Sequence, residues 1–408
     1  MKMTIKKASL ASAILLALTS QASFATNGLA PTGLGQYHKA MGGASVGNPV
    51  NTMSMASNPA AAAFIDDGYD VGLEIFSPNR TATVSEGIPG AGTTFDGNGI
   101  DNFFIPEGGY KKQINAAHSF GITVYGNGGM NTEYEVNPGF GTGKAGIDLQ
   151  QLIISPTWAM KFAEDYSVGV SVNLAYQKFK AEGIQNFTGI SSSPNNVSNN
   201  GYGSSTGVGI TIGLQGKIAD DITAGIAYKS KTKMGKIDKY KGLFPNQGEL
   251  DMPATFSVGM AWQATPKTQI AMDATHIYYA DLAATGNSSH VQLPLGSTDA
   301  AGFGWSNQSV YKIGVKQQIN PKLALMAGYN HGKSPVSEGH TNFNVLAPAV
   351  VEDHASLGFE YKIDNKSSVT GSYIHTFTNE VKADITQLQG FDLEMDQDAV
   401  GIAYSRKF

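Results

Sequence analysis

The sequence of 408 residues contains no cysteine. This excludes disulfide bridges and thiolate metal sites. Basic residues are outnumbered by acidic ones, 28 against 33, so nucleic acid is not expected as a partner. The chain also lacks an apolar run long enough for a transmembrane helix, which needs about 20 residues. A membrane protein built from helices is therefore excluded.

The first 25 residues have the pattern of a secretory signal peptide. Three lysines precede an apolar run at residues 8–18, and the small-x-small sequence Ser23-Phe24-Ala25 follows. The run is too short to anchor the chain across a bilayer core of roughly 30 Å. We expect the mature chain to begin at Thr26, which leaves 28 − 3 = 25 basic residues against 33 acidic ones, a balance of −8.

Bulk composition resembles that of a soluble protein, with 41% hydrophobic residues and a mean hydropathy of −0.15. Glycine (49), tyrosine (17) and phenylalanine (19) are nevertheless abundant. A transmembrane β-barrel gives this combination, because lipid-facing and lumen-facing residues alternate and average hydropathy cancels.

From Tyr69 onward, fourteen segments alternate between apolar and small or polar residues with period 2. Each is about as long as a tilted membrane strand, which takes roughly 9–11 residues. At residues 207–215 the members Val208, Ile210, Ile212 and Leu214 share one face, and residues 356–363 behave in the same way. A soluble β-sandwich would also alternate, so the strand pattern does not decide between the two.

The connections favour a membrane barrel. Short polar links, such as 163–166, 219–221 and 364–366, alternate with long loops along the chain. We expect the long loops at residues 81–102, 128–147, 180–204, 232–252, 280–305 and 331–351. Short turns on one side and long loops on the other are typical of outer-membrane barrels. The last strand places Val400, Ile402 and Tyr404 on the lipid face and ends at Phe408, as in the C-terminal assembly signal of such barrels.

The segment 27–64 does not alternate. It contains Met41-Gly42-Gly43-Ala44-Ser45 and Asn58-Pro59-Ala60-Ala61. Its glycines and prolines favour irregular backbone over a strand ladder. We interpret residues 26–68 as a hatch that plugs the lumen, after the signal peptide at 1–25 and ahead of the barrel at 69–408.

Sequence motifs for catalysis are weak. Gly141-Thr142-Gly143-Lys144-Ala145-Gly146 matches a dinucleotide fingerprint only as a string, because no helical pattern follows it. The eight histidines lack metal-ligand spacing. We expect no cofactor, no metal and no enzyme activity, with a barrel-embedded lipid hydrolase as an alternative.

Two sets of charged residues have a structural and a functional interpretation. Ion pairs across the lumen are the expected role of its charged residues, and one lysine could instead receive a substrate carboxylate. These residues are Lys161, Lys217, Lys316, Lys362, Glu74, Asp273 and Glu360. An acidic series above the last lipid-facing run is either a solvated strand extension or a cation-mediated contact with lipopolysaccharide phosphates. It consists of Asp392, Glu394, Asp396 and Asp398.

Several segments in order resemble the FadL/TodX family of outer-membrane transporters of long-chain fatty acids and aromatic hydrocarbons. They are Met41-Gly42-Gly43-Ala44, Asn58-Pro59-Ala60, residues 73–78, residues 126–134, residues 252–256 and Ser334-Pro335-Val336. The resemblance covers almost the whole mature chain. It implies an all-β, fourteen-stranded antiparallel transmembrane barrel with a hatch, located as a multi-pass protein in the outer membrane of a Gram-negative bacterium.

The resemblance also implies a route for a hydrophobic molecule. Capture would occur between the third and fourth extracellular loops, around Phe187, Ile190, Leu243 and Phe244. The molecule would pass the hatch at Asn58, Pro59 and Ala60 and leave sideways at a kinked third strand, near Gly126, Asn127, Gly128 and Gly129. We expect Asn58 to bond the backbone that this kink frees. The alternative is that these glycines only begin the second extracellular loop.

The implied partners are a long-chain fatty acid or hydrophobic hydrocarbon, outer-membrane lipid and lipopolysaccharide, and the implied state is a monomer. A hydrophilic diffusion porin is the rival function, and the hatch argues against it. A purely structural or adhesive barrel is a third class. The sequence does not distinguish a fatty acid from a neutral hydrocarbon, because both need an apolar cavity.

Overall fold

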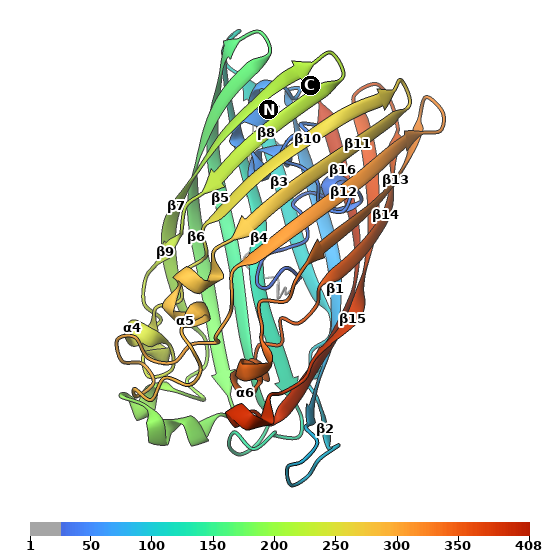
Figure 1. Cartoon of the computed structure of the whole chain (residues 1–408). Coiled ribbons are helices and arrows are strands. Elements are labelled where there is room, and N and C mark those ends of the chain that lie inside the picture. Colours follow the sequence, from blue (N-terminus) through green and yellow to red (C-terminus); the bar gives the residue numbers. More distant parts are fainter. Residues whose placement is uncertain (1–25) are drawn as a thin grey trace, which may run out of the picture.

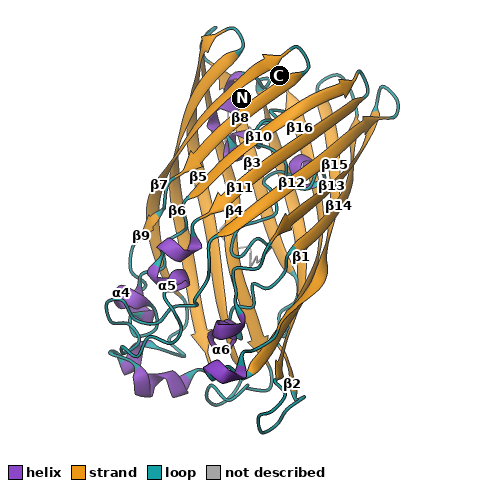
Figure 2. Ribbon diagram, viewed as in Figure 1, coloured by secondary structure: helices purple, strands orange, loops and turns teal. Residues whose placement is uncertain are grey.

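The computed structural model describes residues 26–408, and the predicted signal peptide at residues 1–25 lies outside them. The described residues form one 16-stranded antiparallel sheet that closes on itself through β1 and β16. Two of the strands, β2 and β9, are short additions in loops, which leaves fourteen strands in the barrel wall (Figures 1 and 2). The predicted fold class is confirmed.

The wall strands are β1 Gly68–Val84, β3 Phe103–Gln113, β4 His118–Tyr134, β5 Ala145–Ala163, β6 Tyr166–Glu182, β7 Gly203–Ala219, β8 Ile222–Lys229, β10 Thr255–Thr265, β11 Thr268–Ile277, β12 Gln308–Gln318, β13 Leu323–Gly332, β14 Asp353–Lys362, β15 Ser367–Val381 and β16 Phe391–Lys407. The additions are β2 Thr94–Asp96 and β9 Lys233–Met234. The short helices are α2 Gln36–Lys39, α3 Ser54–Ser57, η1 Pro59–Ala63, η2 Gln185–Ile190, η3 Pro194–Asn196, η4 Asp238–Tyr240, α4 Pro245–Gly248, η5 Tyr279–Asp281, α5 Ala283–Gly286, η6 Glu338–His340, α6 Thr341–Asn344 and η7 Ile385–Gln387. None of the helices between residues 26 and 408 is long and apolar enough to cross a membrane.

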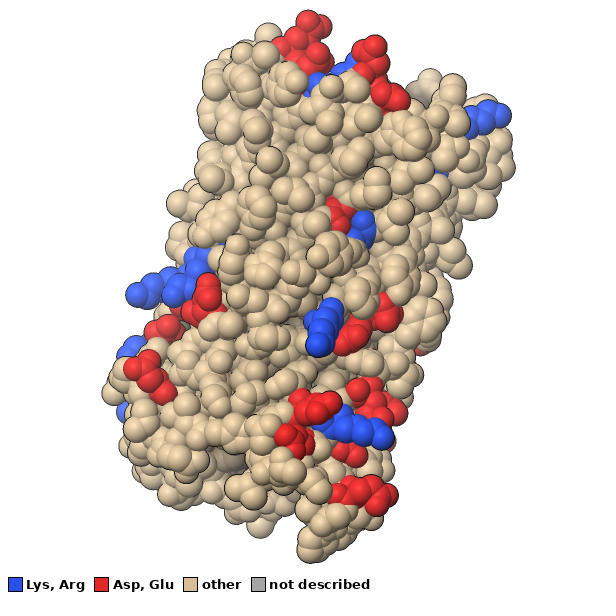
Figure 3. All heavy atoms as spheres, in the orientation of Figure 1, with Lys and Arg blue, Asp and Glu red and all other residues tan. Residues whose placement is uncertain are grey.

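The outer surface of the wall carries the apolar face predicted from alternation. Val208, Ile210 and Ile212 of β7 are each about half exposed, at 54%, 49% and 52%. The strand residues between them turn toward the lumen. Few charged side chains lie between the turn end and the middle of the barrel on the face in Figure 3, whereas more of them gather toward the loop end. Such a belt matches the hydrocarbon core of a bilayer.

The two ends of the barrel differ as predicted, with one exception. Short turns lie at one end, and the long loops with α4, α5 and α6 lie at the other (Figure 1). The predicted loop at 128–147 is wrong. β4 continues to Tyr134 and pairs there with Ala145 of β5, so the second loop is only 135–144. The glycines at 126–129 do not end the strand because the ladder to β5 resumes on their far side.

Barrel closure involves the predicted C-terminal residue. Phe408 packs against Tyr69 and Tyr110, with ring centroids 6.1 Å and 6.0 Å apart. Its amide donates to the Asp67 carbonyl at 3.0 Å. The chain end is therefore fastened to the residues that precede and follow the first strand.

The irregular segment from Asn27 to Asp67 lies inside the barrel, and wall carboxylates bind its backbone amides (Figure 1). Glu107 accepts from the Gly35 and Gln36 amides at 3.1 Å and 2.9 Å, and Asp273 accepts from Ser45 and Val46. Strand glycines let the segment approach the wall closely, because a Cβ atom at any of them would collide with it. They are Gly109, Gly121, Gly128, Gly169, Gly213, Gly225, Gly314, Gly328, Gly358 and Gly401.

Candidate functional site

An apolar groove lies between the extracellular loops and encloses about 510 Å³ of empty space, part of it open to solvent. Its lining comes from the ends of β5 and β6 and from the third to sixth loops. The lining residues are Ile147, Phe179, Phe187, Leu243, Phe244, Pro245, Ala284, Leu295, Ala301, Gly302, Phe303, Phe343 and Leu346. None of them is charged, so the groove suits a hydrophobic molecule rather than an ion.

Three of the four predicted capture residues meet in this groove. Phe187, Leu243 and Phe244 line it, whereas Ile190 is 54% exposed and is not among the lining residues. Phe244 is buried and packs against Phe179, with ring centroids 4.8 Å apart. Edge-to-face packing of this kind fixes the wall of a pocket before a ligand arrives.

The fifth and sixth loops contribute lining that sequence reasoning missed. Phe303 belongs to the fifth loop, and Phe343 and Leu346 belong to the sixth. Phe343 meets Phe187 edge to face at 5.7 Å. Large apolar residues in otherwise polar loops were the available signal, because such residues usually mark a contact surface.

A second cavity lies beside the hatch and has a different chemistry. It encloses about 780 Å³ of empty space between hatch residues and strands β4, β7, β8, β10, β11 and β12. Lys229 and Lys312 line it, together with hydroxyl side chains and apolar residues such as Leu34 and Ile277. No carboxylate is among its lining residues. A cavity with two cations and apolar walls suits an amphipathic anion.

The four lumen lysines considered from the sequence do not line this cavity, and Lys362 is exposed. Lys316 pairs with Glu360 at 2.7 Å, which confirms the ion-pair interpretation for these two residues. Lys217 bonds Asp220, and Lys161 lies over the Phe64 ring. The two lysines of the hatch cavity were missed because alternation predicts the lumen face but not the depth in the barrel.

The hatch motif is anchored to β7 and not to the kink of the third strand. The Asn58 side chain caps η1 by accepting from the Ala60 amide at 3.1 Å. Its amide nitrogen donates to the carbonyls of Val46 and of Leu214 in β7, at 3.0 Å and 3.2 Å. The predicted bond from Asn58 to the kink is therefore wrong, because the motif faces β7 instead of β4.

The mature N-terminal segment separates the groove from the hatch cavity. Tyr279 of the fifth loop donates its hydroxyl to the Asn27 carbonyl at 2.6 Å and accepts from the Leu29 and Ala30 amides at 2.8 Å and 3.0 Å. Burial raises the pKa of Tyr279, so the hydroxyl stays protonated as a donor. Leu29 and Phe244 belong to the same apolar cluster.

The third wall strand, β4, contains the kink. Gly126 pairs with Leu152 and Gly128 pairs with Gln151, so Asn127 is an extra residue that forms a β-bulge. Asn127 also lines the hatch cavity and accepts from Lys229 at 2.7 Å. The alternative that these glycines merely begin a loop is wrong.

The ladder between β3 and β4 stops at this kink. The two strands pair from Gln113↔Ser119 up to Glu107↔Tyr125. Among residues 26–408, β4 then has no strand partner on that side until a single bridge joins Asn98 to Glu133. Pro106 follows the last pair on β3 and brings no backbone N–H, which explains why pairing ends there.

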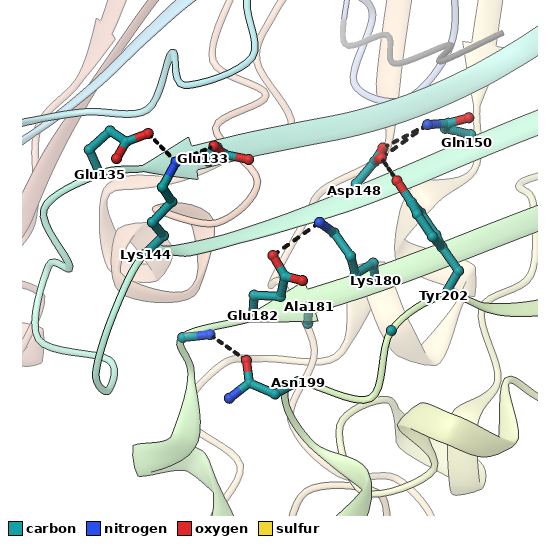
Figure 4. Close-up of polar contacts among 12 residues, drawn as sticks. Glu133, Glu135, Lys144, Asp148, Gln150, Lys180, Ala181, Glu182, Asn199 and Tyr202 are labelled. Carbon is teal, nitrogen blue, oxygen red and sulfur yellow. Dashed lines mark hydrogen bonds and ion pairs between the residues drawn. The ribbon is translucent and has the colours of Figure 1, made fainter.

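Polar residues frame the wall at the extracellular ends of β4, β5 and β6 (Figure 4). Lys144 contacts Glu133 and Glu135, and Lys180 bonds Glu182 at 3.0 Å. Exposed ion pairs of this kind contribute little stability, about 0–1 kcal/mol each. They mark the level at which the wall leaves the hydrocarbon region.

The acidic series on β16 is engaged with neighbouring strands. Asp392 accepts from Ser85 at 2.7 Å, Asp396 from Asn79 at 2.9 Å and Asp398 from Tyr373 at 2.6 Å. In the described part of the chain, no group of three or more His, Asp or Glu side chains is arranged to hold a metal ion.

Serine and histidine side chains meet at three places. These are His38 with Ser54, His276 with Ser309 and His340 with Ser289. In residues 26–408, none of these three histidines also bonds a carboxylate. The geometry therefore gives no support to the hydrolase alternative, because a nucleophile needs a base that a third group orients.

Together, the closed barrel, the hatch in its lumen and the apolar groove at its loop end define a plugged transport barrel of the outer membrane. The family model described as outer membrane protein transport protein (OMPP1/FadL/TodX) matches residues 13–408. The chain belongs to this family, as the sequence resemblance predicts.

Solved structures share the fold. The Pseudomonas putida toluene transporter TodX matches with a TM-score of 0.70 and 19% identity, over 92% of this chain and 99% of that one. A Pseudomonas aeruginosa FadL homologue has a TM-score of 0.70 and 17% identity, over 93% and 100%. The Ralstonia pickettii toluene transporter TbuX has a TM-score of 0.64 and 16% identity, over 92% and 99%. No curated protein sequence matches the chain significantly.

Proposed function

We propose that the protein takes up hydrophobic small molecules from outside the cell. Capture occurs in the loop groove, passage leads to the hatch cavity, and exit is lateral through the gap between β3 and β4. The family and the titles of similar structures, two of them toluene transporters, support uptake of hydrophobic compounds. The protein acts as a monomeric carrier and not as an enzyme.

The observation that carries the proposal is the position of Asn127. This residue is the bulge that accompanies the end of the β3–β4 ladder, and it also lines the hatch cavity. One apolar cluster contains Phe244 and Ile147 of the groove together with Leu29 and Met130. The groove, the cavity and the gap are thus neighbours along one side of the lumen.

The energetics favour such a route for an apolar molecule. Apolar surface gains about 25 cal/mol per Å² on leaving water, so the groove collects the molecule and the membrane receives it. The hatch packs closely against β4 at this place, since the Leu29 carbonyl lies where a Cβ atom of Gly128 would stand.

Within this proposal the hatch cavity selects the head group. Lys229 and Lys312 would receive the carboxylate of a fatty acid, and the apolar lining would hold the first part of its chain. This makes a carboxylate-bearing amphiphile the preferred substrate over a neutral hydrocarbon.

On the outer surface, the acidic series of β16 would meet lipopolysaccharide phosphates through divalent cations.

A porin function is less well supported. A diffusion porin needs a water-filled lumen, whereas hatch residues such as Met41, Ala44 and Asn58 are buried against the wall. The wall carboxylates that bind hatch amides hold the segment in place. Solutes that need water would find no continuous path past it.

The proposal is tested by completing the interrupted ladder between β3 and β4, which we call the seam. The triple variant Pro106→Thr, Gly126→Val and Gly129→Thr restores a backbone donor on β3 and favours regular pairing on β4. Gly128 stays, because a side chain there would meet the Leu29 carbonyl. We expect folded protein in native amount and uptake reduced by about tenfold or more, since the exit is the only step removed.

The matched control is Ala274→Val with Ala355→Thr, two substitutions on fully paired strands of the wall. It should transport at the native rate. Native uptake by the seam variant, measured with a labelled fatty acid in cells, would show that the molecule leaves by another route.

A further inference from the structure

A buried arginine lies at the upper end of the gap between β3 and β4. Arg80 of β1 is 1% exposed. Its guanidinium donates to the Asn131 carbonyl of β4 at 2.6 Å and to the Ile100 carbonyl of the first loop at 2.6 Å. It also donates to the Asn98 side chain at 3.2 Å. The arginine thus connects β1, the first loop and β4 above the place where the β3–β4 ladder stops.

Its partners are unusual for a buried cation. No carboxylate lies within ion-pair distance of Arg80 in the described part of the chain. The four oxygens that accept from the guanidinium are backbone or amide oxygens, and the Phe103 ring lies 6.0 Å away. A buried arginine with only neutral partners is costly to keep unless its fork geometry is needed.

The geometry explains what the fork does. Because the β3–β4 ladder stops at the pair Glu107↔Tyr125, the edge of β4 beyond Tyr125 is no longer paired with β3. Arg80 lies on β1, on the far side of β3 from β4. Its guanidinium donates to the Asn131 carbonyl of β4, which β3 would otherwise bond. A second hydrogen bond to the first loop lies just above, where the Glu133 amide donates to the Gly97 carbonyl at 2.9 Å.

The two ends of the opening are therefore defined. The pair Glu107↔Tyr125 closes it below, and the bond from Arg80 to Asn131 closes it above. The free edge between them runs from Gly126 to Met130, which at about 3.3 Å per residue is roughly 15 Å of strand.

We propose that Arg80 sets the upper limit of the lateral opening and thereby the size of the molecule that can leave through it. This inference rests on the proposed lateral exit. Loss of the guanidinium would extend the free edge of β4 toward Glu133 and admit wider molecules. Arg80 is a positioning residue, because it acts through the backbone of β4.

The variants are Arg80→Met, which removes the fork and keeps a flexible side chain, and Arg80→Lys, which keeps the charge. The matched control is the double variant Lys316→Met with Glu360→Gln, which removes a lumen cation and its partner from β12 and β14. Hydrogen exchange followed by mass spectrometry reports on the β4 edge. We expect peptides over residues 126–132 to exchange about tenfold faster in Arg80→Met, with β12 and β13 unchanged.

Uptake of two probes of different width reports on the size limit. Cells that express each variant are given toluene as the narrow probe and pyrene as the wide one. In Arg80→Met the ratio of pyrene to toluene uptake should rise at least about threefold, Arg80→Lys should lie between this variant and the native protein, and the control should keep the native ratio.

A native ratio of uptake in Arg80→Met overturns the proposal, whatever the exchange of β4. Exchange of residues 126–132 at the native rate in that variant also overturns it, because other bonds would then hold the edge of β4. Failure of the lateral exit itself would give a different result. The seam variant, in which Arg80 is intact, would then show native uptake.

Discussion

The two cavities of this protein differ in the chemistry of their walls. The loop groove is lined by Phe187, Phe244, Phe303 and other uncharged residues, whereas the hatch cavity adds Lys229 and Lys312 to its lining. An uncharged apolar groove accepts hydrophobic molecules with little regard for their head groups. A cavity with two lysine side chains in its lining discriminates between them. We therefore propose that capture is general and that selection occurs at the hatch.

The largest effect should follow from removal of the hatch, which abolishes the second cavity and leaves the first. A variant that lacks residues 26–64 and keeps the signal peptide should still form a folded, heat-modifiable barrel, because the strands satisfy their ladders by closure. In planar bilayers it should conduct ions, whereas the native protein should not. Failure of this variant to assemble at all would contradict the separate roles of wall and hatch.

A smaller effect should follow when the groove is filled. Ala301 lines it, and Ala301→Trp would place an indole ring in the groove. Uptake at limiting substrate should fall by about tenfold for fatty acid and hydrocarbon alike, because capture precedes selection. The control is Leu388→Trp, at an exposed position of the seventh loop. Equal uptake by the two variants would mean that the groove is not the capture site.

The most selective effect should come from the lysines. In Lys229→Met with Lys312→Met, binding of a labelled fatty acid should weaken by roughly 10- to 100-fold, because charge-assisted hydrogen bonds contribute about 1.5–3 kcal/mol. Uptake of toluene should stay at the native rate. The control Lys316→Met with Glu360→Gln alters a lumen ion pair outside the cavity. Parallel losses for both substrates would show that the lysines support structure and not selection.

Local patterns were enough to predict the wall. Alternation at residues 207–215 predicts the lipid face, and short turns against long loops predict the two ends of the barrel. The capture residues Phe187, Leu243 and Phe244 could be placed in one region because their loops are consecutive. These features depend on neighbours in the sequence.

The remaining features depend on contacts between distant segments. Lys229 and Lys312 reach one cavity because β8 and β12 lie on the same side of the lumen as Asn127. The end of the β3–β4 ladder follows from Pro106 and the bulge, not from glycine content. Gly314 and Gly328 face each other in β12 and β13, and that ladder is continuous. There the glycines make room for Met41 and Gly42 of the hatch.

The central claim is that the molecule leaves between β3 and β4, and reversible closure of this seam tests it most directly. The chain has no cysteine, so Phe104→Cys with Gly126→Cys introduces a unique pair across the gap, which a cleavable bis-methanethiosulfonate can join. The control pair, Tyr311→Cys with His331→Cys, spans the complete ladder of β12 and β13.

We predict that joining residues 104 and 126 lowers uptake of a labelled fatty acid by about tenfold or more, that reduction of the linker restores it, and that the control pair has no effect in either state. Undiminished uptake, with mass spectrometry showing the linker in place between residues 104 and 126, would contradict lateral exit.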